Sequence, residues 1–401
     1  MTTSSPAPST GGRWLVGAAI VLLAVNLRIA VGSVGVVLDA IRGDLGMSVT
    51  TAGILTTLPV LCFSLFGVVS GGPIRRLGLH HTAALVLVLM AVGIAVRATV
   101  DDVGVFLVCS VVALAGGAVG NVILPPLVKV HFPDRIPLVS SLYGAALMAG
   151  ATLSSVATVP LANGFGGWRA GTGAWALVAL LALVPWLVML RRDVHAGPTT
   201  DHRIAVRDVI GSPVVWALVL TFAMQSGGAY AQFGWFAAMV RDAGVSATSA
   251  GVALGIISAV GIPVTLLLPR LVAAAGDRPW LPIGFGLLSA TGWAGVLLAP
   301  AAAPWFWALL LGIGGCAFTW ALTMIARRAR TAAGTATLSM LTQGIGYIIA
   351  GFGPFGAGAL HEATGSWDAS VIMLIGTSLL IAVFGSIVTR PVMLEDTLRR
   401  R

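Results

Sequence analysis

The chain has 401 residues, of which 57% are hydrophobic and only 9% are charged, and its formal net charge is +9. Because soluble proteins carry about 25% charged residues, this composition excludes a water-soluble enzyme, a nucleic-acid-binding protein and a disordered chain. Three cysteines, Cys62, Cys109 and Cys316, lie inside apolar runs, and their spacing argues against a disulfide framework and against a zinc site.

Apolar runs long enough to cross roughly 30 Å of hydrocarbon, about 20 residues each, recur along the chain. Since lipid offers no hydrogen-bond partner to an open strand or loop, these runs predict helices. The twelve predicted spans are Trp14–Leu38, Val49–Ser70, His81–Thr99, Gly104–Val128, Pro137–Ala162, Trp168–Leu190, Pro213–Val240, Ser249–Leu268, Leu281–Ala299, Pro304–Ala326, Thr335–Leu360 and Asp368–Thr389. The predicted fold is an all-α membrane protein with twelve transmembrane helices in two six-helix halves.

The predicted organisation follows from the polar segments between the spans. Residues 1–12 form a disordered cytoplasmic tail, 13–190 the N-terminal half, 191–212 a cytoplasmic linker, 213–390 the C-terminal half and 391–401 a second cytoplasmic tail. Most Lys and Arg residues fall on the side of the two tails and the linker, whereas the opposite side holds Arg42, Arg97, Arg169 and Arg241. By the positive-inside rule, both termini are predicted to be cytoplasmic.

An internal repeat relates the two halves at a shift of about 200 residues. Gly167-Trp168 matches Ser366-Trp367, and Leu142-Tyr143-Gly144 matches Thr342-Gln343-Gly344. Leu114 to Gly117 likewise matches Ile313-Gly314-Gly315, and Asn26 matches Gln225. Halves repeated in this way are typical of carriers that bind substrate at mid-membrane between them and rock to give alternating access.

The turn between the second and third spans resembles the Gly-x-x-x-Asp-Arg-x-Gly motif of the major facilitator superfamily. Gly71, Arg76 and Gly78 match that motif, while Arg75 occupies the position where an Asp is usual. The twelve-span, two-half arrangement resembles the same superfamily. The resemblance implies a conformational latch at this turn, without its usual carboxylate.

Longer stretches resemble the bacterial cyanate/2-nitroimidazole transporter family within that superfamily. They are Asn26-Leu27-Arg28, Leu55 to Phe63, Gly120-Asn121 to Pro125, Gln225-Ser226 with Tyr230, Thr342-Gln343 with Gly346-Tyr347 and Gly353-Pro354, and Thr364 to Trp367. One departure is the seventh span, where Trp235-Phe236-Ala237 lacks an expected Pro. The resemblance implies a transporter of small anionic or nitro-bearing solutes.

Arg28 is the most informative residue, because it lies about 13 residues into its span, or roughly 20 Å deep. An arginine near the bilayer centre costs about 2.5–3.5 kcal/mol, so Arg28 must face a cavity or a partner. No Asp or Glu occurs inside any predicted span. Either backbone carbonyls and amide side chains satisfy the guanidinium, or a bound anion supplies the missing charge through bidentate bonds. We favour the anion site.

Other polar and aromatic residues at membrane depth complete the candidate site. The predicted substrate-binding residues are Arg28, Asn26, Asn121, Gln225, Tyr230, Trp235, Gln343 and Tyr347. The amides would satisfy polar atoms of the substrate and the aromatic rings would pack against its faces. Hydrogen bonding between helices is the alternative role for the Gln and Tyr residues and for Asn26. Gly116-x-x-x-Gly120 and Gly251-x-x-x-Gly255 predict close helix packing.

The sequence therefore predicts a secondary transporter that moves a small, planar, anionic or nitro-aromatic solute, cyanate- or nitroimidazole-like, across the bacterial inner membrane. A drug efflux transporter of broader specificity is the alternative. The sequence holds no catalytic dyad, metal cluster or nucleotide-binding motif, so neither an enzyme nor a cofactor is predicted. The expected partners are a small-molecule substrate and the lipid bilayer, with no nucleic acid, and the protein is expected to be a monomer.

Overall fold

A computed structural model describes residues 10–69, 76–190 and 211–398, and every regular element in those ranges is helical. The helices are α1 (Thr10–Gly35), α2 (Leu38–Leu45), α3 (Val49–Val69), α5 (Leu79–Arg97), α6 (Val103–His131), α7 (Ile136–Phe165), α8 (Trp168–Gly173), α9 (Trp175–Met189), α11 (Pro213–Ala231), η2 (Gln232–Phe236), α12 (Ala237–Asp242), α13 (Ala247–Ala275), α14 (Trp280–Leu298), α15 (Pro304–Gly315), α16 (Ala317–Arg327), α17 (Ala332–Ala350), α18 (Phe352–Thr364), α19 (Asp368–Val388) and α20 (Leu394–Leu398).

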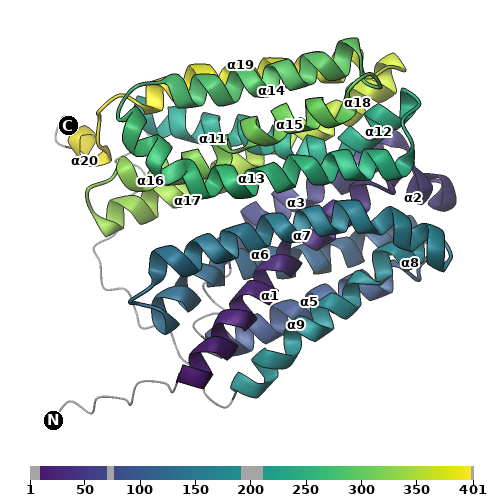
Figure 1. Ribbon diagram of the computed structural model, residues 1–401, viewed down its shortest axis with the longest axis horizontal. Helices are drawn as coiled ribbons and strands as arrows, with labels where there is room; N and C mark the ends of the chain where they lie inside the picture. The colour runs from purple at the N-terminus through teal and green to yellow at the C-terminus, as the bar shows by residue number, and fades with distance from the viewer. Residues whose placement is uncertain (1–9, 70–75, 191–210, 399–401) are drawn as a thin grey trace.

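The long helices run roughly side by side and form two groups, one from each half of the sequence (Figure 1). The start of α1 and the end of α19 lie at the same end of the bundle, on the left of the view. We call this the near end, and the end that carries α2, α8 and α12 the far end. The predicted all-α fold in two halves is confirmed, while the side of the membrane that each end faces stays a prediction.

Eleven helical stretches in the described ranges are long and apolar enough to cross a membrane. The remaining predicted span, Thr335–Leu360, is divided into α17 and α18 at Gly351. The sequence predicts a bend at this point, and the α-helix is interrupted there by a single residue. Gly353 packs so closely against Gly227 of α11 that a Cβ there would overlap the backbone.

Several local features differ from the sequence-based expectation. Thr10–Gly12 begin α1 instead of belonging to a tail, and the predicted C-terminal tail contains α20. The short helices α2 and α20 carry charged side chains, so a search for long apolar runs misses them. Almost all of the predicted linker 191–212 lies outside the described residues, and the boundaries of the halves stay a prediction.

The repeat is visible in side-chain contacts at the far end. The indole nitrogen of Trp168 donates to Asp44 at 3.0 Å, and that of Trp367 donates to Asp242 at 2.7 Å. Both pairs join the start of the last span of a half to the short helix, α2 or α12, that follows the long helix of its first span. The same contact therefore closes each half.

The two halves touch one another at the far end. The Arg241 guanidinium donates to Asp39 at 2.9 Å and so joins α12 to α2. Gly35 of α1 packs against η2, where a Cβ would overlap the carbonyl oxygen of Phe233. Gly251 of α13 similarly lies against the backbone of Ser155 in α7, which confirms close packing at this glycine pair. Bulkier residues at these positions would hold the halves apart.

At the near end, α20 is joined to the turn before α17. Both carboxylate oxygens of Glu395 accept the backbone N–H of Arg330 at 3.0 Å, and Oε1 also accepts the N–H and hydroxyl of Thr331. The Arg330 guanidinium pairs with Asp396. Burial alone would raise the pKa of Glu395, but these hydrogen bonds to the charged form outweigh it and lower the pKa.

This network predicts a pH-dependent contribution to stability. A carboxylate whose pKa is lowered on folding stabilises the folded protein above its ordinary pKa, and this contribution is lost as the pH falls through the lowered value. Glu395→Gln is therefore expected to lower the melting temperature modestly at neutral pH, and the difference from the wild type should shrink as the pH falls below the ordinary pKa of Glu, about 4.3, and through the lowered value. Thermal unfolding across this range is the measurement. A difference in melting temperature that does not change with pH would contradict this role for the carboxylate.

Candidate functional site

Arg28 lies in the middle of α1 and is buried, with 8% of its surface exposed. One terminal nitrogen donates to the hydroxyl of Tyr230 at 3.0 Å, and the guanidinium carbon lies 5.5 Å from the ring centroid of Phe63. The Nε atom is buried and has no hydrogen-bond partner. Among the described residues no carboxylate forms an ion pair with Arg28. The site thus presents a positive charge that the protein leaves largely uncompensated.

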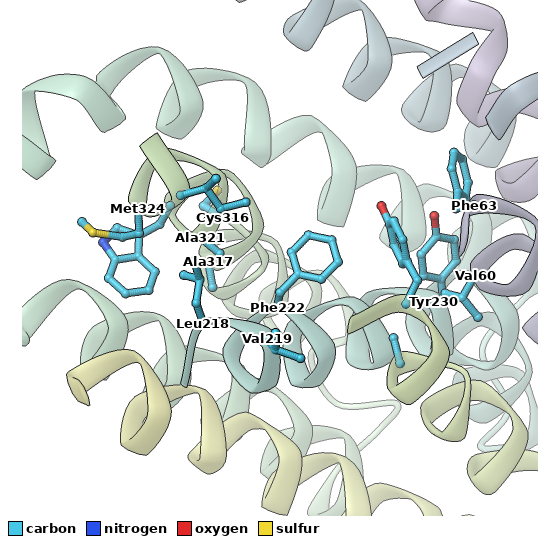
Figure 2. Close-up of a cluster of buried hydrophobic side chains, with 14 of the residues drawn as sticks. Val60, Phe63, Leu218, Val219, Phe222, Tyr230, Cys316, Ala317, Ala321 and Met324 are labelled. Atoms are coloured by element: carbon cyan, nitrogen blue, oxygen red, sulfur yellow. The ribbon is translucent and has the colours of Figure 1, made fainter. Parts of the chain in front are cut away.

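Three aromatic rings gather around this guanidinium. The ring centroid of Phe63 lies 6.3 Å from that of Tyr230 and 5.7 Å from that of Tyr347, and the two tyrosine rings are 6.4 Å apart. Figure 2 shows Tyr230 beside Phe63 and Val60, well away from the Cys316–Met324 group of the same apolar cluster. The rings come from α3, α11 and α17, so both halves contribute to the surroundings of Arg28.

A cavity of about 570 Å³ extends from Arg28 between the halves. Its lining includes Asn121 of α6 and Gln343 and Tyr347 of α17, three of the predicted site residues. It also includes Tyr143 of α7, a residue of the internal repeat that was not predicted to belong to the site. The lining residues of α7, Tyr143 and Leu147, come from the near-end portion of that helix. This volume is in the range of roughly 300–1,000 Å³ that is typical of small-molecule sites.

A second cavity of about 80 Å³ lies on the other side of Arg28, against the C-terminal half. The predicted residues Gln225 and Tyr230 line it, together with Gln232, which lies on the same face of the α11–η2 segment as Gln225. Gln225 donates its amide nitrogen to the carbonyl oxygen of Gly315 at 2.9 Å. Because that partner is only an acceptor, the orientation of the amide is fixed and its oxygen is left free.

Three buried polar atoms on the wall of this small cavity have no partner. They are Oε1 of Gln225 and the hydroxyl oxygens of Ser226 and Ser258. Each of these residues is at least nine-tenths buried. Buried polar groups are normally paired, so an unpaired group that lines a cavity points to a ligand or to water. The cavity therefore offers one acceptor and two hydroxyls opposite the positive charge of Arg28.

Two predicted site residues do not line either cavity. Asn26 is fully buried and donates to the carbonyl oxygen of Leu22 in its own helix at 2.8 Å. Trp235 is also fully buried, and its indole nitrogen donates to the carbonyl oxygen of Pro354 at 2.8 Å, which joins η2 to α18 at the far end. The structure thus places both residues in packing positions away from the Arg28 cavities.

The motif that resembles the superfamily latch is only partly described. Gly71 lies outside the described residues, whereas Arg76 is exposed at the near end. Gly78 precedes α5 with φ of 83°, a conformation that side chains rarely adopt, and its carbonyl oxygen accepts the hydroxyl of Thr82. The corresponding turn of the C-terminal half carries Asp277, which pairs with Arg328 at 2.9 Å. The C-terminal half thus carries a carboxylate in this turn, whereas the N-terminal half has Arg75 where the superfamily motif has an Asp.

Arg97 lies at the far end of α5, as its place near the end of the third predicted span implies, but the sequence did not predict that its side chain is buried. It is the last residue of α5 and is only 1% exposed, because its guanidinium turns back toward α1. Its position three residues before the end of an apolar run is typical of a membrane-edge arginine. The sequence indicates only that no acidic residue inside the spans could pair with a buried arginine.

Cysteine reactivity separates cavity-lining residues from packing residues. In a background without the native cysteines, Gln343→Cys is expected to react rapidly with a small polar thiol reagent, since Gln343 lines the large cavity. Gln225→Cys should react more slowly, because only 5% of the surface of Gln225 is exposed. Asn26→Cys should not react, because Asn26 is fully buried. Labelling followed by mass spectrometry gives the three rates. Equal rates at all three positions would contradict the arrangement of the cavities.

Comparisons with known proteins agree with this geometry. The sequence model of the Major Facilitator Superfamily matches residues 16–351. The chain is 33% identical over 387 residues to the 2-nitroimidazole transporter of Escherichia coli K12, covering 96% of this chain and 97% of that protein. It is 28% identical to the cyanate transport protein CynX of the same organism, covering 92% and 96% of the two chains.

Solved structures show the same fold at lower sequence identity. A bacterial homologue of the human lysosomal transporter Spinster, in an inward-facing and unoccupied conformation, superposes with a TM-score of 0.80 at 17% identity, covering 97% of this chain and 99% of that one. The nucleoside transporter NupG has a TM-score of 0.77 at 11% identity, covering 93% and 99%. Both are transporters built from the same helical arrangement.

Proposed function

The chain belongs to the major facilitator superfamily and is a multi-pass membrane transport protein, and on this premise we propose that it carries a small planar solute with an anionic or nitro group across the bacterial inner membrane by alternating access. The resemblance to the cyanate and 2-nitroimidazole transporters is confirmed by the identity over nearly the whole chain. The choice of substrate is the part that we propose.

The observation that carries the proposal is the uncompensated charge of Arg28 between two cavities. A buried guanidinium without an acid is costly, and a ligand with a negative or electron-rich group removes that cost on binding. Nitro and carboxylate groups present two coplanar oxygen atoms that match the fork of a guanidinium. The rings of Phe63 and Tyr347 would pack against the faces of a planar ligand.

The small cavity suggests what the other end of the solute carries. The free oxygen of Gln225 can only accept a hydrogen bond, so a ligand that reaches it needs an N–H or O–H group. A nitroazole with a ring N–H offers both a nitro group for Arg28 and a donor for Gln225. A linear pseudohalide such as cyanate offers no donor, and its binding would leave Gln225 unsatisfied.

The membrane orientation extends the proposal to the transport cycle. If the near end is cytoplasmic, as the distribution of Lys and Arg predicts, the large cavity lies on the cytoplasmic side of Arg28. The contacts at the far end, including Asp39 with Arg241, then close the path to the outside. On this assignment the structure corresponds to an inward-facing state of the carrier.

A matched pair of ligands tests the proposed substrate class. We expect 2-nitroimidazole to raise the melting temperature of the purified protein, and its N-methyl derivative, which lacks the ring N–H, to do so much less. Gln225→Ala should reduce the difference between the two compounds. A drug efflux transporter would instead bind diverse lipophilic compounds independently of Arg28. If small anions and nitro compounds produce no saturable shift, the proposed substrate class is wrong.

A further inference from the structure

A second buried arginine, Arg97, lines neither of the two cavities that Arg28 lines, but a third pocket that Tyr230 also lines. The guanidinium of Arg97 reaches the carbonyl oxygen of Ala30 and the hydroxyl oxygen of Ser33 at 3.4 Å, longer than a usual hydrogen bond. Its Nε atom has no hydrogen-bond partner, and only 1% of the residue's surface is exposed to solvent. No acidic residue in the described ranges forms an ion pair with Arg97. Its charge is therefore solvated by weak dipoles alone.

A small pocket of about 20 Å³ adjoins this guanidinium. The hydroxyl oxygen of Ser110 in α6 also lines the pocket, is fully buried and has no partner. Two residues with an unpaired group that can donate a hydrogen bond, one of them a cation, thus line the same small pocket. Since one water molecule needs roughly 10–15 Å³ by this measure, the pocket admits a single atom-sized occupant.

We propose that this pocket is a binding site for a monatomic anion, chloride under physiological conditions, held by Arg97 and Ser110. A water molecule would fill the space but would leave the arginine charge uncompensated in a low-dielectric surrounding, where charge is costly. A halide accepts hydrogen bonds from both donors and also neutralises the charge. Polyatomic anions such as phosphate exceed the available volume. This pocket shares the wall formed by Tyr230 and Phe233 with the small cavity beside Arg28, but the anion site does not depend on the identity of the substrate.

The walls of the pocket link the anion to the conformation of the carrier. Arg97 and Ser110 belong to the N-terminal half, whereas Tyr230, Phe233 and Gly234 close the pocket from α11 and η2 of the C-terminal half. Because both halves contribute, the pocket is complete only while the far end is closed. Bound chloride is therefore expected to stabilise this state over the one open at the far end.

Equilibrium dialysis of radioactive chloride against protein purified in sodium gluconate, at constant ionic strength, tests the site. Wild type and Arg28→Gln are expected to bind one chloride per chain with saturation, and Arg97→Gln to bind none. Ser110→Ala should bind about tenfold more weakly, because a lost hydrogen bond to a charged group costs about 1.5 kcal/mol or more. Ser155→Ala is the matched control, since its hydroxyl is also buried and unpaired but does not line the pocket.

Each alternative outcome overturns the proposal in a distinct way. An absence of saturable chloride binding by the wild type would mean that the pocket holds water. Loss of binding in Arg28→Gln with retention in Arg97→Gln would move chloride to the proposed substrate site. If Arg97→Gln does not fold, the contrast between Ser110→Ala and Ser155→Ala decides, and equal affinities of these two variants would reject the site.

Discussion

Replacement of Arg28 by Gln is expected to weaken substrate binding by roughly 30-fold to several thousand-fold, since removing one member of a buried charge pair costs about 2–5 kcal/mol. The amide retains some hydrogen bonding to Tyr230 but loses both the charge and the two-pronged geometry. Folding should persist, because the substitution removes a buried charge that no described acid neutralises. Ligand binding by calorimetry and uptake at matched expression are the measurements.

Arg28→Lys separates charge from geometry in the same experiment. It restores the charge as a single point donor, so we expect partial recovery of binding. Gly376→Ala is a suitable control in α19, because a Cβ there meets no neighbouring atom and Gly376 lines none of the described cavities. Uptake by Arg28→Gln equal to that of the wild type would show that the guanidinium does not hold the substrate.

Gly35→Ala is expected to slow transport by disfavouring closure of the far end. The added Cβ would overlap the carbonyl oxygen of Phe233, which is backbone and cannot rotate away. Overpacking of this kind costs about 1–3 kcal/mol, which shifts the balance between the two states by roughly 5-fold to more than 100-fold. Arg28 stays in place, so binding of ligand from the far side should persist.

Distances between spin labels on the two halves report this shift. Labels at the exposed positions Asn163 and Thr248, one on each half at the far end, should move apart in Gly35→Ala. Gly43→Ala is the matched control, since Gly43 lies at the same end and its Cβ would enter open space. Unchanged label distances in Gly35→Ala, or equal changes in both variants, would refute the role of this contact in closure.

The fold was predictable because membrane spans leave a strong signal in the sequence. Length, apolarity and the repeat predict the spans and the two halves, and the glycines around Gly351 predict the bend. The π-helical turn at Gln232–Phe236 was not among the features predicted from the sequence. Gly234 packs there against Thr56 of the other half, a contact that no local pattern encodes.

The site was predictable where a residue is out of place in lipid. Arg28 stands out for that reason, and Asn121, Gln225 and Gln343 are polar at similar depth and do line cavities. Depth in the membrane does not identify the role of Trp235, because an indole is equally suited to packing between helices and to binding a substrate. Arg97 was missed because depth along a helix does not reveal which way a long side chain turns at its end.

The unpaired charge of Arg28 is expected to make transport sensitive to membrane voltage. In the proposed alternating-access cycle the residue stays on α1 while the barrier passes from one side of it to the other, so the empty carrier would expose a positive charge first to one compartment and then to the other. A charge that crosses the whole field changes in energy by about 2.3 kcal/mol per 100 mV. In a cell that is negative inside, the empty carrier is therefore held facing inward. A bound monovalent anion would cancel the charge, so the reorientation of the loaded carrier would not depend on voltage. A neutral nitro compound would leave the charge in place, so the reorientation of both the empty and the loaded carrier would depend on voltage.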